Sequence, residues 1–141
     1  MSRSFQVTFD ANDTAKLADF WLEALGYQRQ PLPPGYETWE DLAEEKGIEM
    51  GSVDAVIDPD GVGPRLFFQR VPEGKTAKNR LHLDVIVTDP GSEARDRRAV
   101  IDAEVDRLVA LGAMKIEDFD DRGFGTWTVM HDPEGNEFCV E

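Results

Sequence analysis

The sequence has little cysteine, little histidine and little basic charge for its 141 residues. Its single cysteine, Cys139, cannot form a disulfide bond within the chain, which favours a reducing compartment such as the cytoplasm. Lys and Arg together number 15 against 29 Asp and Glu, so the formal net charge is -14. Because an acidic surface of this kind repels nucleic acids and anionic membranes, we expect neither as a partner.

Long apolar runs are also missing. No stretch of roughly 18 apolar residues could span a bilayer, and residues 1–13 lack the apolar core of a signal peptide. Hydrophobic residues make up 40% of the chain and charged residues 31%, which is the composition of a globular protein rather than a disordered one. The length suits one domain with a real core. We therefore expect a single cytoplasmic domain over residues 1–141.

Hydrophobic periodicity predicts alternating strands and helices in both halves of the chain. In the first half, Asn12 or Asp13 can cap a helix that Gly26 ends. The elements expected there are a strand over 4–10, that helix, a short helix over 39–46, and antiparallel strands over 53–57 and 65–71. The elements expected in the second half are a strand over 81–87, a helix ending at Gly112 with Ile101, Val105, Leu108 and Val109 on one face, and strands over 114–119, 126–131 and 136–140.

Three features of the first half recur in the second half in the same order. The pairs are Ala24-Leu25-Gly26 with Ala110-Leu111-Gly112, Asp58-Pro59-Asp60-Gly61 with Asp132-Pro133-Glu134-Gly135, and strand 5–9 with strand 81–85. Leu-Gly helix ends and Asp-Pro-x-Gly turns are common, so coincidence is the alternative. The shared order favours a duplicated strand-helix-strand-strand-strand unit, with module 1 over about 1–75, module 2 over about 80–141, and the short helix 39–46 inserted in the first.

Strand alternation predicts which side chains point away from the helices. On each first strand the apolar residues pack under the helix, so the intervening polar residues share the opposite face. If both modules join one curved sheet, these side chains line a concave pocket with apolar walls and a few polar groups, the usual form of a small-ligand site. The pocket candidates are Gln6, Thr8, Phe67, Gln69, His82, Asp84, Trp127, Met130 and Cys139.

Three motifs, taken in order on this duplicated frame, carry a resemblance to a known family. They are Leu17-Ala18-Asp19-Phe20-Trp21 with Leu25-Gly26-Tyr27, then Arg80-Leu81-His82-Leu83-Asp84, and Asp132-Pro133-Glu134-Gly135-Asn136-Glu137-Phe138-Cys139-Val140. The chain resembles the glyoxalase-like branch of the vicinal oxygen chelate superfamily along essentially its whole length. The resemblance implies an α+β fold of two βαβββ modules, which form a cupped mixed or antiparallel sheet with helices on its outer face.

The resemblance also implies where a metal would bind. Catalytic members hold a metal with four ligands on the floor of the cup, and the matching positions here are Gln6, Gln69, His82 and Cys139. Hard ions such as Mg, Mn or Fe prefer anionic oxygen ligands, which two amides, an imidazole and a thiol do not supply. Asp84 shares the face of His82 but lies two residues along the strand, roughly 6.5 Å away. We therefore expect no metal and no other cofactor, with a divalent metal at the four positions as the alternative.

These observations favour a small-molecule-binding protein, with no residue assigned to catalysis. One alternative is a metal-dependent lyase, isomerase or dioxygenase, whose metal acts as a Lewis acid on a small oxygenated substrate. Another is an antibiotic-sequestering protein, similar to bleomycin-resistance relatives, in which an acidic cup holds a cationic drug. His82 also has a plainer interpretation as an ordinary polar strand residue. Sheet edges left open by each module favour a homodimer.

Overall fold

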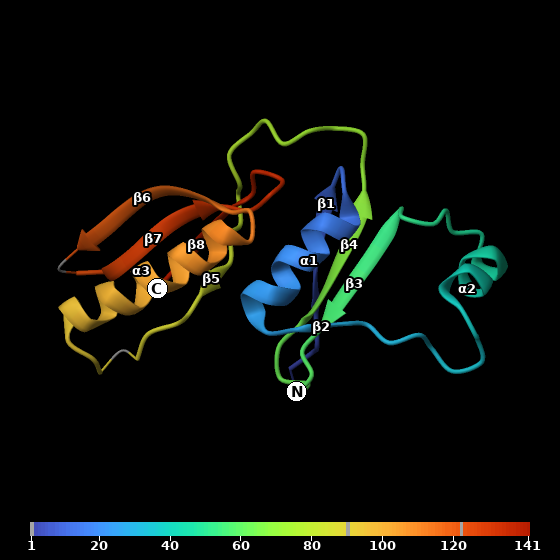
Figure 1. The fold of residues 1–141 in the computed structure, drawn as a ribbon, viewed down its shortest axis with the longest axis horizontal. Coiled ribbons are helices and arrows are strands. Elements are labelled where there is room, and N and C mark those ends of the chain that lie inside the picture. The colour runs from blue at the N-terminus through green and yellow to red at the C-terminus, as the bar shows by residue number, and fades with distance from the viewer. Residues whose placement is uncertain (1, 90, 122) are drawn as a thin grey trace. The chain divides into compact units, whose positions relative to one another are not determined.

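The computed structural model describes residues 2–89, 91–121 and 123–141. The chain divides into two compact units, residues 1–74 and residues 75–141 (Figure 1). Each unit contains one four-stranded mixed sheet with a long helix on one face. Among the described residues, none of the helices combines the length and the apolar character that crossing a bilayer requires.

The first unit builds its sheet from four strands and carries two helices. Its elements in chain order are β1 (Gln6–Ala11), α1 (Thr14–Leu25), β2 (Gln28–Arg29), α2 (Trp39–Lys46), β3 (Val53–Ile57) and β4 (Arg65–Arg70). The strand order is β1-β4-β3-β2; β1 runs parallel to β4, and the other pairs are antiparallel. The predicted pairing of strands 53–57 and 65–71 is confirmed, whereas the two-residue strand β2 was not anticipated.

Helix α1 forms where the sequence supplies a cap, an apolar stripe and a stop. The Asp13 side chain accepts a hydrogen bond from the Lys16 N–H, and Gly26 ends the helix in the left-handed region at φ 67°. Trp21 is buried at the centre of the stripe, 5.4 Å from the ring centroid of Phe9. Phe9 in turn stacks on Phe68 of β4 at 5.4 Å. These aromatic contacts fix α1 on one face of the sheet and leave the opposite face open.

Helix α2 lies in the connection between strands β2 and β3 of the first sheet (Figure 1). Its bounds match the expected range 39–46. A capping box begins it: Thr38 accepts from the Asp41 N–H at 3.1 Å, and the Asp41 carboxylate accepts from the Thr38 N–H at 3.1 Å. Gly47 ends it at φ 66°. Only Ala43 of this helix is buried, so tertiary packing stabilises the helix little and the capping interactions at its two ends matter more.

The second unit repeats the path of the first without the inserted helix. Its elements are β5 (Asp84–Val85), α3 (Ala94–Ala110), β6 (Met114–Asp121), β7 (Gly125–His131) and β8 (Glu137–Val140). The strand order β5-β8-β7-β6 corresponds position by position to the order in the first unit, with β5 parallel to β8. The α+β fold of two βαβββ modules is therefore confirmed.

The turns that motivated the duplication have the same hydrogen-bond pattern in both units. Asp58 accepts from the N–H groups two and four residues later, at 2.9 and 3.0 Å. Asp132 does the same with the N–H groups of Glu134 and Asn136, at 2.9 and 3.0 Å. The fourth residue of each turn is a glycine with positive φ, 70° at Gly61 and 85° at Gly135.

Two expectations about the second unit were wrong in extent. The strand expected over 81–87 contains only Asp84 and Val85, and Leu81 is 71% exposed. Apolar and polar residues do alternate over 81–87, but only Asp84 and Val85 pair with β8. The apolar face of α3 consists of Ile101, Val105 and Leu108, whereas Val109 is 45% exposed because it follows directly after the buried stripe.

Candidate functional site

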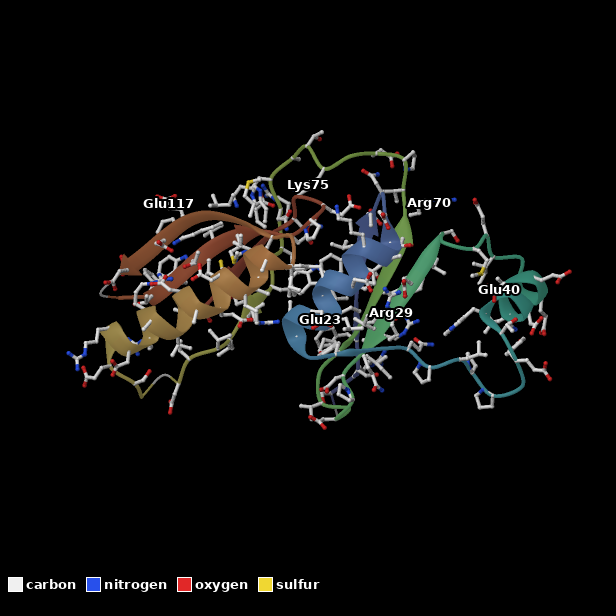
Figure 2. The ribbon with its side chains drawn as sticks, viewed as in Figure 1. Glu23, Arg29, Glu40, Arg70, Lys75 and Glu117 are labelled. Atoms are coloured by element: carbon white, nitrogen blue, oxygen red, sulfur yellow. The ribbon has the colours of Figure 1, made fainter. Side chains whose placement is uncertain are left out.

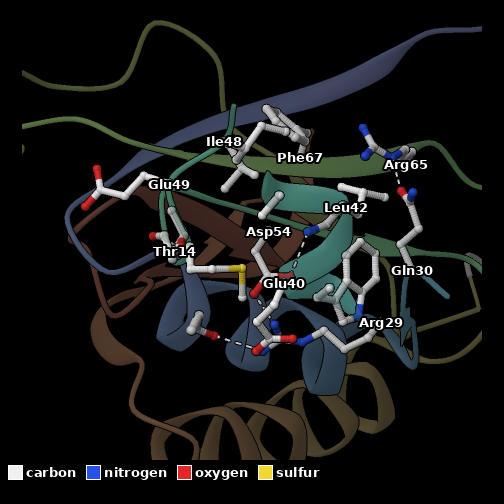
Figure 3. A pocket seen from close by; sticks show the side chains of 17 residues that line it. Thr14, Arg29, Gln30, Glu40, Leu42, Ile48, Glu49, Asp54, Arg65 and Phe67 are labelled. Carbon is white, nitrogen blue, oxygen red and sulfur yellow. Dashed lines mark hydrogen bonds and ion pairs between the residues drawn. The ribbon is translucent and has the colours of Figure 1, made fainter. Parts of the chain in front are cut away.

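A cavity of about 490 Å³ lies in the first unit, where α2 and the chain after it face strands β3 and β4 (Figure 3). Strand β2 pairs only with Val56 and Ile57, so the first residues of β3 have no strand on their outer side in the described part of the chain. The segment from Trp39 to Gly51 lines this region instead. The insertion that the sequence left without a role thus forms one wall of the cavity.

The walls of this cavity carry apolar side chains that remain open to solvent. Trp39, Ile48 and Met50 line it and are each more than a third exposed. Phe67 of β4 and Leu42 of α2 add further apolar surface. Exposed apolar side chains that gather in a hollow mark a place where a ligand or partner removes water.

Most charges beside the cavity are neutralised within the protein. Arg29 bonds to the carboxylates of Asp54 and Asp19, and Arg70 pairs with Glu49 at 2.6 Å. Burial by itself lowers the pKa of Arg29, but the bonds to Asp19 and Asp54 outweigh it and leave that pKa raised. Figure 2 shows Arg29 and Arg70 beside the first sheet.

Arg65 differs from these arginines because its partners are neutral. Its Nε donates to Gln30 Oε1 at 2.6 Å (Figure 3). Its Nη1 donates to Gln6 Oε1 at 2.8 Å. The guanidinium lies over the Phe67 ring, 5.0 Å from the centroid. Burial lowers the pKa of Arg65 from its ordinary value. The cavity therefore contains one guanidinium with no acidic partner among the described residues.

The predicted pocket residues of the first unit share the open face of its sheet. Register pairs Gln6 with Arg65, Thr8 with Phe67 and Asp10 with Gln69. Gln6 and Gln69 thus lie four residues apart along the strands, about 13 Å at the usual rise. Only Phe67 among the predicted residues lines the cavity itself.

Three predicted residues of the second unit come together. Donor atoms of His82, Asp84 and Cys139 all lie within 4.8 Å of one another, and His82 Nε2 is 3.2 Å from Asp84 Oδ1. The spacing of roughly 6.5 Å expected along the strand does not keep the two side chains apart, and His82 itself precedes β5, which begins at Asp84. Asp84 and Cys139 are direct partners in the parallel β5–β8 register.

The thiol in this cluster is not poised to react. Burial, followed by the nearby Asp84 carboxylate, raises the pKa of Cys139 to about 11. The thiol is therefore protonated at neutral pH, which lowers both its nucleophilicity and its readiness to bind a cation.

Trp127 and Met130 lie on opposite faces of β7. Trp127 stacks on Phe119 of β6, with ring centroids 5.0 Å apart. Met130 is fully buried and pairs with Phe138 of β8. It shares a face of β7 with Thr128, whose hydroxyl accepts a hydrogen bond from Arg98 of α3. The placement of Met130 in the open pocket was wrong, because residues an odd number of positions apart on a strand point to opposite faces.

The metal site that the resemblance implies can be tested against these donors. A hard ion needs mainly anionic oxygens, but the cluster supplies one carboxylate, one imidazole and one protonated thiol. His, Asp and Cys are instead three ligand types of zinc. The amides of the first unit are engaged elsewhere: Gln6 accepts from Arg65 at 2.8 Å, and Gln69 donates to Asp10 at 2.7 Å. The donor set does not fit a hard ion. Zinc deprotonates a thiol that coordinates it, so His82, Asp84 and Cys139 could still hold zinc.

Sequence reasoning missed Arg65 and Gln30 as cavity residues, whereas Trp39 in the insertion is predicted either to pack or to cover the mouth of a pocket. A signal for Arg65 was present, since it lies two residues before Phe67 and therefore on the same face of the strand. Gln30 gave no such signal, because it lies beside β2, a strand too short to recognise.

The paired βαβββ units have the architecture that the resemblance to the glyoxalase-like branch implies. A family model described as a glyoxalase-like domain matches residues 6–141. The chain therefore belongs to the glyoxalase-like domain family. No curated protein sequence matches it.

Solved structures with this fold are distant in sequence. A glyoxalase/bleomycin resistance protein/dioxygenase family enzyme from Burkholderia phytofirmans PsJN matches with a TM-score of 0.64 at 15% identity, covering 96% of this chain and 94% of its own. The fosfomycin resistance protein FosX from Listeria monocytogenes matches at 0.65 with 11% identity, covering 99% and 92%. A possible glyoxalase from Bacillus cereus matches at 0.62 with 14% identity, covering 99% and 98%. Identities this low establish the fold alone.

Proposed function

We propose that this protein binds a small molecule, and that the cavity of the first unit receives it. The observation that carries the proposal is the exposed apolar wall formed by Trp39, Ile48 and Met50 opposite Phe67 and Arg65. A volume of about 490 Å³ lies within the usual range of small-ligand pockets, roughly 300–1,000 Å³. An apolar wall with a few polar groups gives affinity through burial and orientation through hydrogen bonds.

A thermal-shift screen of common metabolites tests this proposal with two matched variants. Ala15 is an exposed residue of α1 that lines the cavity, and Ala103 is an exposed residue of α3 in the other unit. Compounds that raise the melting temperature of the wild type should also stabilise Ala103→Trp, but not Ala15→Trp, whose indole occupies the cavity. A ligand at 100 times its Kd adds about 2.7 kcal/mol of stability, which is readily measured. Hits that stabilise all three proteins equally would contradict the assignment.

The second candidate function is that of a metal-dependent enzyme, a lyase, isomerase or dioxygenase. The cluster of His82, Asp84 and Cys139 supports it, with zinc as the ion its donors suit. Zinc there would act as a Lewis acid toward substrate oxygens. Our leading proposal expects no stoichiometric metal after dialysis. Zinc that survives dialysis in the wild type and is lost in His82→Ala would favour the enzyme instead.

Antibiotic sequestration is a special case of the binding function. The net charge of -14 is its support, because a cationic drug would be attracted to such a surface. Cationic antibiotics included in the same screen test it: stabilisation by these compounds and by no metabolite would favour this role.

We further propose a homodimer and a cytoplasmic location. Strand β6 is an edge of the second sheet that exposes Met114 and Ile116, which a second copy could cover. The cytoplasm suits a chain whose single thiol, Cys139, is buried and free. Light scattering that gives the mass of one chain at micromolar concentration would contradict the dimer.

A further inference from the structure

One of the two arginines that line the cavity has no acidic partner among the described residues. Arg29 is neutralised by Asp19 and Asp54, whereas Arg65 contacts only two neutral amide oxygens. The remaining N–H groups of Arg65, those of Nη2 included, have no acceptor among the described residues. Buried or half-buried guanidinium groups are normally paired, so this one is suited to accept an anion from outside.

The surroundings of Arg65 strengthen its attraction for an anion. It is partly buried on the open face of β4, where reduced solvation makes an ionic contact stronger than in bulk water. Stacking over Phe67 and the bonds to Gln6 and Gln30 hold the guanidinium plane in place. A fixed planar fork of N–H groups matches the two oxygens of a carboxylate.

We infer that Arg65 binds the carboxylate of a small organic acid whose apolar body lies against Phe67 and the wall of Trp39, Ile48 and Met50. This inference rests on the proposed function, since it names the class of ligand for the same cavity. The acid should carry a single negative charge, because Glu40 lines the same cavity and the chain as a whole is strongly acidic.

A cationic ligand has less support in the cavity. Asp54 is paired with Arg29, and Glu49 is paired with Arg70. The remaining acid, Glu40, is exposed on α2, where an ion pair with a ligand is screened by water. Carboxylates outnumber guanidinium groups in the cavity lining, so the preference for an anion is a local property of Arg65, whose guanidinium has no acidic partner among the described residues.

The experiment compares three probes of one shape: 3-phenylpropionate, its neutral amide 3-phenylpropanamide, and the cation 3-phenylpropylamine. Calorimetric titration should show the carboxylate binding at least about tenfold more tightly than the amide, because hydrogen bonds to charged groups contribute about 1.5–3 kcal/mol. Arg65→Met should abolish this preference, and Arg65→Lys should retain part of it through charge alone. Arg95→Met removes an equal charge from an exposed position of the other unit and should leave the preference intact.

The outcomes separate this inference from the proposed function. Binding of the amide or the amine without a preference for the carboxylate leaves the proposed function standing and overturns the inference. A preference that survives in Arg65→Met, with an unchanged urea midpoint, also overturns it. Failure of all three probes to bind at millimolar concentration contradicts both.

Discussion

The two units follow the same path but carry different chemistry on their open faces. The first presents Gln6, Gln69 and Arg65, all in hydrogen bonds with side chains of the same sheet or of Gln30 beside it. The second presents the cluster of Asp84 on β5, Cys139 on β8 and His82 just before β5. The inserted helix α2 exists only in the first unit, and the cavity lies beneath it.

The buried side of each unit has diverged much less. Leu17, Trp21 and Ala24 in α1 have the same four-then-three spacing as the buried residues of α3, which are Ile101, Val105 and Leu108. The Asp-Pro-x-Gly turns also retain their hydrogen bonds. Packing and turn geometry therefore preserve the scaffold, while residues on the open face are free to change the ligand.

The strongest test of this shared scaffold is the centre of each buried stripe. Trp21→Ala should lower the free energy of unfolding by about 3–5 kcal/mol, because it removes a fully buried indole from contact with Phe9 and Phe20. Val105→Ala, at the matching position of α3, should cost about 2 kcal/mol, since it deletes only two methyl groups. Urea unfolding followed by circular dichroism measures both.

Equal losses in the two variants would contradict this ranking. They would indicate that the stripes do not stabilise their units through buried apolar volume. Trp21→Phe is a milder change, so its free energy of unfolding should lie between those of the wild type and Trp21→Ala.

The next test concerns the repeated turns. Asp132→Ala should destabilise the protein by about 2–3 kcal/mol, because a nearly fully buried carboxylate that accepts several N–H groups is lost. Asp58→Ala should cost less, since Asp58 is only half-buried. The matched variants Asp132→Asn and Asp58→Asn keep an acceptor oxygen and should restore part of the loss. Urea midpoints of the four variants decide the order, and a larger loss at Asp58 would contradict it.

A smaller, pH-dependent difference is expected at the start of the second unit (Figure 2 labels Lys75). Burial would raise the pKa of Glu137, but its backbone N–H, Lys75 and the Asn79 N–H outweigh burial and lower that pKa from 4.5 to about 2. Because the folded pKa lies below the unfolded one, this stabilisation is complete above about pH 4.5 and is lost as the pH falls toward 2.

Removal of the cation should reduce this pH dependence. Lys75 Nζ lies 3.1 Å from Glu137 Oε2, and Lys75→Met should raise the folded pKa of Glu137 and cost about 0.5–1 kcal/mol at pH 7. Urea midpoints measured between pH 7 and pH 3 should fall less steeply in this variant than in the wild type. Parallel curves would show that Lys75 does not influence Glu137.

The features predictable from sequence were those set by local chemistry. Helix α2 was predicted to the residue because Thr38 and Gly47 mark its two ends. The Asp58 and Asp132 turns were recognisable for the same reason, since each is determined within five residues. Strand β3 was also predicted to its ends.

The features that failed depend on partners distant in sequence. The position of His82 follows from how little of its segment pairs with β8, which no local pattern reports. The partners of Arg65 are Gln30 and Gln6, and the latter lies 59 residues away in sequence. The prediction for Met130 was wrong for a simpler reason: strand alternation already places Met130 and Trp127 on opposite faces of β7. The predicted convergence of Gln6, Gln69, His82 and Cys139 remains a prediction.

The smallest expected effect tests the one element without a counterpart in the second unit. Thr38→Ala removes the side-chain oxygen that accepts from the Asp41 N–H, and losing such a cap costs a helix about 1 kcal/mol. Because α2 buries only Ala43, the urea midpoint of the whole chain should barely move. Amide hydrogen exchange within residues 39–46 should accelerate by about fivefold, since 1.4 kcal/mol corresponds to about tenfold. Thr38→Ser keeps the oxygen and should exchange like the wild type. If Thr38→Ala lowers the global midpoint as much as Asp132→Ala does, α2 is part of the cooperative core, and its role as a separately stabilised wall of the cavity is wrong.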